Sequence, residues 1–213
     1  MSQDVPPTFE ELQECVQDVI TYLKRLDAPN IGQTRILVIG GVALCKYLRN
    51  RTTKDADFWI NLKNAPKSVK ERLVAIPNSP FIQQADFFRY IHPQSGKRIQ
   101  VDFVADWMAP HLENKAVPLG SLSSGTIPWL NETDLLVCKI DACGERAETD
   151  KRVQDAGDAI ALTRDLTRGG HNLHLSNVQT GIVINGLDDL VRYSGQEKAW
   201  WEQKLGLRSS ATP

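Results

Sequence analysis

Two short apolar stretches, each interrupted by acidic residues, constrain this chain most. Asp55 and Asp57 lie one residue apart among Ala, Phe, Trp and Ile in the stretch 55–60, and Asp102 lies within the apolar stretch 98–106. Both stretches alternate in polarity with a period of two, which predicts β-strands with the acids on one face and apolar side chains on the other. Close like charges repel each other, so this acidic face is expected to hold a positive charge.

A glycine pair lies between a predicted strand and a predicted helix. The run RILVI, 35–39, is apolar and rich in β-branched residues, which is typical of a buried strand. From 42 to about 50 the pattern is helical. Gly40 and Gly41 therefore fall at a tight turn, where a phosphate could approach the backbone N–H groups at a helix N-terminus.

The other patterns in the first half complete a fold class. A Thr-x-x-Glu capping box, Thr8 to Glu11, opens an amphipathic helix. Another helix is expected to begin at Pro66, and a turn over 93–96 joins two strands into a hairpin. The order helix, strand, helix, strand, helix, hairpin predicts an α/β (α+β) fold, with a small mixed sheet and flanking helices followed by a helical C-terminal part.

The second half of the chain changes in character. Residues 107–131 are rich in Pro, Gly and Ser, which indicates a connector, and the pattern from Thr133 onward is helical. We therefore expect a core over 1–106, a connector over 107–131, and a helical C-terminal part over 132–208 that packs on the core.

Composition narrows the class of protein. The 213 residues are 41% hydrophobic and 24% charged, as in an ordinary folded chain. Without a long apolar run or a signal-peptide pattern, we expect a cytoplasmic protein and no membrane contact. Four cysteines without paired spacing predict reduced thiols and no catalytic cysteine. The net charge of −1 gives no overall attraction to nucleic acid. A local basic rim is still possible around the first acidic stretch, from Arg49, Arg51, Lys54, Lys63, Lys67, Lys70 and Arg72.

The acids and the glycine pair together suggest a chemistry. Mg²⁺ prefers oxygen ligands and commonly takes one or two carboxylates plus substrate phosphates. If the two acidic strands are neighbours, Asp102 can add a third carboxylate to Asp55 and Asp57. A phosphate site beside a cation site is what metal-assisted phosphoryl or nucleotidyl transfer needs. The alternatives are structural: an ordinary strand-to-helix turn at the glycines, and a polar start to the strand at 55–57.

These motifs resemble those of the nucleotidyltransferase superfamily of the DNA polymerase β type. Its pattern is a hydrophobic residue followed by Gly and then Gly or Ser, a spacer of about a dozen residues, Asp-x-Asp/Glu, and a third Asp on a later strand. This chain has thirteen residues in the spacer. The matching segments are Ile39-Gly40-Gly41, Asp55-Ala56-Asp57-Phe58 and Val101-Asp102-Phe103.

The C-terminal part is similar to that of the AbiEii and MenT toxin-like nucleotidyltransferases. In that group a helix carries a Lys, and after an Arg a basic-Asp-x-x-Asp stretch returns to the active site. Lys139, Arg146, Asp155 and Asp158 match these positions. Gln154 departs from the pattern, since the group usually has Lys or Arg there.

The resemblance implies an enzyme that moves NMP from an NTP to a hydroxyl acceptor with Mg²⁺ or Mn²⁺. It implies metal binding by the three aspartates and a catalytic role for them and for Lys139. The acceptor is left open among an RNA or tRNA end, a protein and a small molecule, and an antitoxin-like partner is a further expectation. The alternative is a catalytically degenerate nucleotide-binding or adaptor protein of the same fold. The nucleotide-binding residues would be Gly40, Gly41, Lys139, Arg146 and Asp155.

Overall fold

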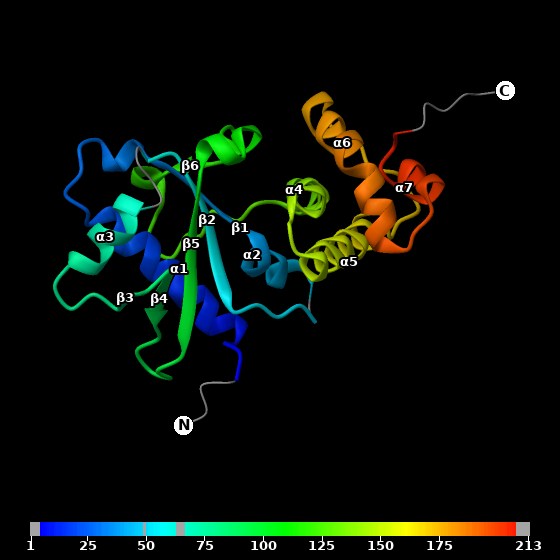
Figure 1. Ribbon diagram of the computed structural model, residues 1–213. Coiled ribbons are helices and arrows are strands. Elements are labelled where there is room, and N and C mark those ends of the chain that lie inside the picture. The colour runs from blue at the N-terminus through cyan, green and yellow to red at the C-terminus, as the bar shows by residue number, and fades with distance from the viewer. Residues whose placement is uncertain (1–4, 49, 63–66, 208–213) are drawn as a thin grey trace. The chain divides into compact units, whose positions relative to one another are not determined.

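The computed structural model describes residues 5–48, 50–62 and 67–207, and the chain divides into two compact units (Figure 1). Unit 1 runs from Met1 to Leu130 and unit 2 from Asn131 to Pro213. Unit 1 contains the sheet, and the described part of unit 2 is helical. The predicted fold class, a mixed sheet with flanking helices followed by a helical part, is confirmed.

Unit 1 is built on a mixed six-stranded sheet with the strand order β3-β4-β5-β2-β1-β6. The central strands β2 and β5 are parallel, and the other neighbouring pairs are antiparallel. Short 3-10 helices η1 to η4 span Ile31–Gln33, Asp106–Met108, Pro110–Leu112 and Leu119–Ser121. The main elements are α1 (Phe9–Lys24), β1 (Arg35–Ile39), α2 (Gly40–Tyr47), β2 (Asp55–Ile60), α3 (Lys67–Ala75), β3 (Phe81–Gln84), β4 (Phe87–Ile91), β5 (Arg98–Ala105) and β6 (Val117–Pro118).

Helix α1 begins at the predicted capping box and covers one face of the sheet. The Thr8 hydroxyl accepts from the Glu11 N–H at 3.2 Å, and the Glu11 carboxylate accepts from the Thr8 N–H at 2.6 Å. The apolar side of α1 packs against the sheet (Figure 1). The main hydrophobic core lies between them, and it includes Leu12, Val16, Val19, Val38, Phe58, Val101 and Phe103.

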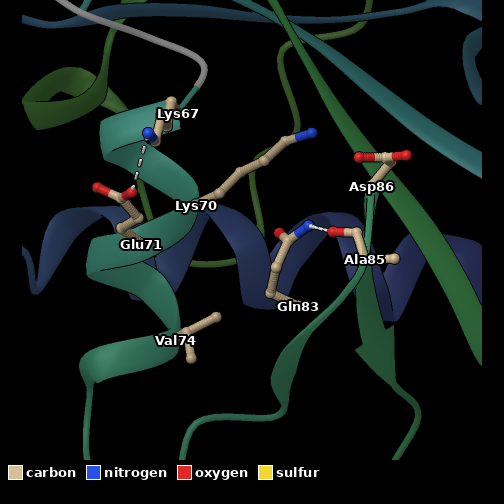
Figure 2. Close-up of a pocket in the computed structure, with 7 residues that line it drawn as sticks. All are labelled: Lys67, Lys70, Glu71, Val74, Gln83, Ala85 and Asp86. Atoms are coloured by element: carbon tan, nitrogen blue, oxygen red, sulfur yellow. Dashed lines mark hydrogen bonds and ion pairs between the residues drawn. The ribbon is translucent and has the colours of Figure 1, made fainter.

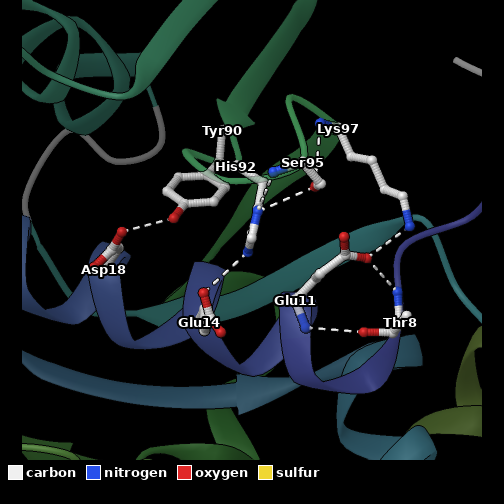
Figure 3. Close-up of polar contacts among 8 residues, drawn as sticks. All are labelled: Thr8, Glu11, Glu14, Asp18, Tyr90, His92, Ser95 and Lys97. Carbon is white, nitrogen blue, oxygen red and sulfur yellow. Dashed lines mark hydrogen bonds and ion pairs between the residues drawn. The ribbon is translucent and has the colours of Figure 1, made fainter. Parts of the chain in front are cut away.

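Polar contacts fasten α1 to the hairpin of β4 and β5 (Figure 3). The Tyr90 hydroxyl donates to the Asp18 carboxylate at 2.6 Å, and Lys97 Nζ lies 2.8 Å from Glu11 Oε2. The hairpin itself confirms the predicted turn over 93–96. Its strands are thus held both by backbone pairing and by side chains of α1.

Two parts of the sheet were not expected from the sequence. Strand β3 pairs with β4 and adds an edge to the predicted hairpin. At the other edge, β6 pairs with β1 through Arg35 opposite Pro118, so part of the segment 107–131 belongs to the sheet of unit 1. Proline is tolerated there because an edge strand has only one hydrogen-bonded neighbour. Pro66, the expected start of α3, lies outside the described residues.

Unit 2 contains the helices α4 (Glu132–Glu145), α5 (Thr149–Leu166), α6 (Asn177–Ser194) and α7 (Lys198–Lys204). A Cβ at Gly186 would lie only 2.9 Å from the Ile140 carbonyl oxygen, so glycine allows α6 to approach α4 closely. The predicted packing of these helices on the N-terminal core stays a prediction. In the ranges that the structure describes, no helix is both long enough and apolar enough to cross a membrane.

The four cysteines are free, as the sequence predicted. Burial raises the pKa of the Cys138 thiol to about 12 and that of the Cys143 thiol to about 11. A thiol with such a pKa is protonated at neutral pH, and the thiolate is the reactive form. These two residues are therefore poor nucleophiles.

Candidate functional site

The acidic residues of both stretches lie on one face of the sheet in unit 1. Strands β2 and β5 are neighbours, with Asp57 opposite Asp102 and Asp55 opposite Gln100. Residues opposite each other on paired strands point to the same face, and residues two apart on a strand do so as well. The alternating apolar residues Ala56, Phe58, Val101 and Phe103 fill the core on the other face.

Exposure to solvent differs along this face of β2 and β5. Asp55, Asp57 and Asp102 are partly exposed, whereas Trp59, further along β2, is fully buried. The Trp59 indole N–H donates to the Ala109 carbonyl oxygen at 3.0 Å. The segment that follows β5 therefore contacts Trp59, whereas the three aspartates are partly exposed.

The glycine turn lies directly beside the carboxylates. Gly40 is the first residue of α2 and has a φ of 67°, which favours glycine. A Cβ at Gly40 would lie 2.1 Å from Asp57 Oδ2, and one at Gly41 would lie 2.6 Å from Thr53 Oγ1. The N-cap residue Ile39 provides no side-chain hydrogen bond to the helix. Asp57 thus packs against the point where the backbone N–H groups of α2 begin.

Asp102 has two side-chain partners that sequence reasoning missed. Lys70 Nζ of α3 lies 3.3 Å from Asp102 Oδ1, and the Gln100 amide donates to Oδ2 at 2.6 Å. Lys70 appeared in the sequence only as one member of a basic rim, since nothing local ties it to a residue 32 positions later. Two other members of that rim, Arg49 and Lys63, lie outside the described residues.

The donor set suits a divalent cation, but the carboxylates are not gathered around one. Three aspartates on an open face offer the oxygen ligands that Mg²⁺ prefers. Among the residues that the structure describes, however, no three His, Cys, Asp or Glu side chains form a group that could hold a metal ion. Both oxygens of Asp102 are engaged by Lys70 and Gln100.

The residues expected to act from the C-terminal part form an ion cluster within unit 2. Lys139 Nζ of α4 lies 2.6 Å from Asp155 Oδ1 and 3.1 Å from Asp158 Oδ2, both on α5. Arg146 Nε lies 3.1 Å from Asp155 Oδ2. Lys139 and both aspartates are buried, while the Arg146 side chain is 48% exposed. Gln154, where the resembled group has a basic residue, is exposed and does not take part in these contacts.

A cavity of about 590 Å³ lies beside the carboxylate face, between α3 and the β3–β4 edge of the sheet (Figure 2). Lys70 of α3 lines this cavity and also contacts Asp102 of the acidic face. The other lining residues are Lys67, Glu71, Val74, Gln83, Ala85 and Asp86.

Comparison with known proteins supports the fold. No family model matches the chain, and no curated protein matches it. The structure is similar to the crystal structure of an antigenic nucleotidyltransferase-like protein from Paracoccidioides brasiliensis. The TM-score is 0.61 at 16% sequence identity, over 94% of this chain and 96% of that chain. The chain therefore has a nucleotidyltransferase-like fold, and the AbiEii or MenT subtype stays a prediction.

Proposed function

We propose that this protein is a Mg²⁺- or Mn²⁺-dependent nucleotidyltransferase that transfers NMP from an NTP to a hydroxyl acceptor. One observation carries the proposal: Asp57 lies opposite Asp102 on paired parallel strands, with Asp55 on the same open face and Gly40 against Asp57. Carboxylates on neighbouring strands repel each other, and a bound cation would relieve that repulsion.

In this proposal each residue of unit 1 has a distinct task. A divalent cation held by Asp55, Asp57 and Asp102 would neutralise charge on the triphosphate and promote attack on the α-phosphate, with pyrophosphate leaving. The backbone N–H groups of Gly40 and Gly41, at the N-terminus of α2, would donate to a phosphate of the NTP. A carboxylate oxygen of Asp102 would accept the proton of the acceptor hydroxyl.

The expected roles of the unit 2 residues are part of the same proposal. Arg146 is the member of the ion cluster with an exposed side chain, and a guanidinium suits contact with phosphates. Lys139 forms an ion pair with Asp155, and Asp155 also forms one with Arg146. We propose that these three residues take part in nucleotide binding, with Arg146 as the direct phosphate contact.

The net charge of the chain bears on the kind of acceptor. A net charge of −1 argues against a long track of nucleic-acid contacts, because phosphate contacts supply most of that affinity. An acceptor presented locally, such as a tRNA end, a protein side chain or a small molecule, needs only a small site. We include an antitoxin-like partner among the expected ligands of the protein.

A thermal-unfolding screen tests the function without knowledge of the acceptor. The wild type is heated with ATP, GTP, CTP or UTP, with and without Mg²⁺ or Mn²⁺. A ligand of the native state at about 100 times its Kd stabilises by about 2.7 kcal/mol, so one NTP with metal should raise the unfolding temperature clearly. Asp57→Asn keeps the shape of the side chain but removes the charge, and it should lose this response.

The control is Asp188→Asn, because Asp188 lies on α6 and pairs at the surface with Lys198. It should respond to NTP and metal as the wild type does. If an NTP stabilises the wild type and Asp57→Asn equally in the absence of metal, the degenerate nucleotide-binding alternative is favoured. The absence of any nucleotide response would refute the proposed function. If the response depends on metal and on Asp57, labelled NTP can be used to identify the acceptor.

A further inference from the structure

The cavity beside the acidic face has no task in the proposed function. It measures about 590 Å³, and small-molecule sites in proteins occupy about 300–1,000 Å³. One wall is formed by α3, from which Lys70 and Val74 point into the space (Figure 2). The opposite wall is formed by Gln83 of β3 and by Ala85 and Asp86, the turn between β3 and β4. A cavity of this size between two polar walls suits a small polar molecule.

Lys70 gives the α3 wall a positive charge in a fixed position. Its Nζ lies 3.3 Å from Asp102 Oδ1 and 5.8 Å from the centre of the Phe88 ring, and its side chain is only 18% exposed. In Figure 2 the ammonium points away from α3, towards the side of Asp86. A lysine ammonium has three N–H donors, so the contact with Asp102 leaves donors for an anionic group of a ligand.

The opposite wall offers hydrogen-bond acceptors. The Gln83 amide N–H donates to the Ala85 carbonyl oxygen at 2.6 Å, and the amide oxygen of Gln83 then faces α3 (Figure 2). Ala85 has a φ of 49°, which is uncommon for a residue with a Cβ, so this bond helps to hold a strained turn. Among the ion pairs of the described residues, none involves Asp86. A carboxylate and an amide oxygen are thus available to a cationic group.

We propose that this cavity binds a small zwitterion of the α-amino acid class. The carboxylate of the ligand accepts from Lys70, its ammonium donates to Asp86 and to the Gln83 amide oxygen, and its side chain lies near Val74. A simple anion would gain Lys70 but meet repulsion from Asp86, and a simple cation would gain Asp86 but meet repulsion from Lys70. The site requires neither a metal nor nucleotidyl transfer.

A titration with matched ligands tests the inference. The common L-amino acids are titrated singly into the wild type, without nucleotide or metal, and binding is followed by ligand-observed NMR. At least one should bind with a Kd of about 1 mM or tighter. The tightest is then compared with its decarboxylated amine and its deaminated acid, which for leucine are isoamylamine and isocaproate. Each should bind about tenfold more weakly, because it lacks one charge-assisted hydrogen bond.

Two variants assign each charge of the ligand to one wall. Asp86→Asn removes the charge that meets the ammonium, so the variant should no longer prefer the amino acid to the deaminated acid. Lys70→Met removes the charge that meets the carboxylate, so it should no longer prefer the amino acid to the amine. Each variant should bind the amino acid about tenfold more weakly than the wild type does.

The control is Glu71→Gln. Glu71 also borders the cavity, but its carboxylate pairs with the exposed Lys67 at 3.9 Å and points away from Asp86 in Figure 2. This variant should bind the three ligands as the wild type does, and unfolding temperatures show that all the variants are folded. If no amino acid binds, or if Asp86→Asn and Lys70→Met keep the wild-type preferences, the proposal is overturned. The proposed function is judged separately, by the NTP response and its loss in Asp57→Asn.

Discussion

The two units each contain a lysine bound to aspartate, in very different surroundings. In unit 1, Lys70 meets one oxygen of Asp102, and both side chains are in part exposed. In unit 2, Lys139 meets Asp155 and Asp158, and these three side chains are at most 10% exposed. The same pair of functional groups is thus solvated in one place and enclosed in the other.

This difference in exposure determines how much free energy it costs to separate each lysine–aspartate pair. Separating a solvated pair costs little, because water takes over both charges. Separating a buried pair leaves an uncompensated charge in a medium that solvates it poorly. We therefore expect the Lys70 contact to separate readily and the Lys139 contact to act as a fixed brace between α4 and α5.

The largest effect is expected from breaking the buried cluster. Lys139→Met leaves Asp155 and Asp158 buried without their ammonium, and it should lower the free energy of unfolding by about 3–5 kcal/mol. Urea unfolding followed by circular dichroism measures this loss. In the matched control, Lys151→Met, the lysine pairs with the exposed Glu148, so the loss should stay below about 1 kcal/mol. Equal losses in the two variants would show that the two environments do not differ as described.

A smaller loss of stability is expected at the glycine turn beside the acidic face. Gly40→Ala combines a φ of 67° with a Cβ 2.1 Å from Asp57 Oδ2, so it should cost about 2 kcal/mol or more and displace the Asp57 side chain. Gly96→Ala is the control. Gly96 has nearly the same φ, 68°, but its Cβ would meet no described atom within 4 Å, so only about 1 kcal/mol should be lost. Chemical denaturation compares the two, and a Gly40→Ala variant as stable as Gly96→Ala would contradict the close approach.

The smallest effect on stability is expected from the ion pair between Glu11 and Lys97, which is partly exposed. Burial alone would raise the pKa of Glu11, but the hydrogen bonds from Lys97 and the Thr8 N–H outweigh it and lower the pKa from 4.5 to about 2. A lowered folded-state pKa adds stability above the unfolded value, and this stability is lost as the pH falls from 4.5 towards 2. Glu11→Gln should therefore cost about 1 kcal/mol at neutral pH and show a flatter loss of stability across that window.

The control for this experiment is Glu10→Gln, one residue earlier in the same turn and exposed. It should follow the wild-type pH profile. If Glu11→Gln loses stability in acid as steeply as the wild type, other carboxylates must carry the pH dependence.

Much of the fold could be predicted because its signals are local. The Thr8 to Glu11 capping box, the apolar strand β1 and the alternation of β2 and β5 each depend on neighbours a few residues away. Strand β3 was missed because it has only four residues and no clear period. The pairing of β6 with β1 was missed because an irregular, Pro-rich segment gives no strand signal.

The shared face of the acidic residues could be predicted from the sequence, but their contacts could not. That Asp55 and Asp57 share a face follows from the strand period alone. That Asp102 lies opposite Asp57 depends on the register of two parallel strands, and the link from Lys70 to Asp102 depends on how α3 packs. Likewise, the burial of Lys139 between Asp155 and Asp158 depends on how α5 packs against α4.

The sequence by itself determined which side chains point together within each strand and helix, and where glycine permits a turn beside an acid. These properties follow from backbone geometry and sterics over a few residues. Only the tertiary structure decided which strands are neighbours, which lysine is buried and which is left in reach of water. Those outcomes depend on register and packing between distant segments, and they set the local dielectric that makes one lysine–aspartate contact exchangeable and the other fixed.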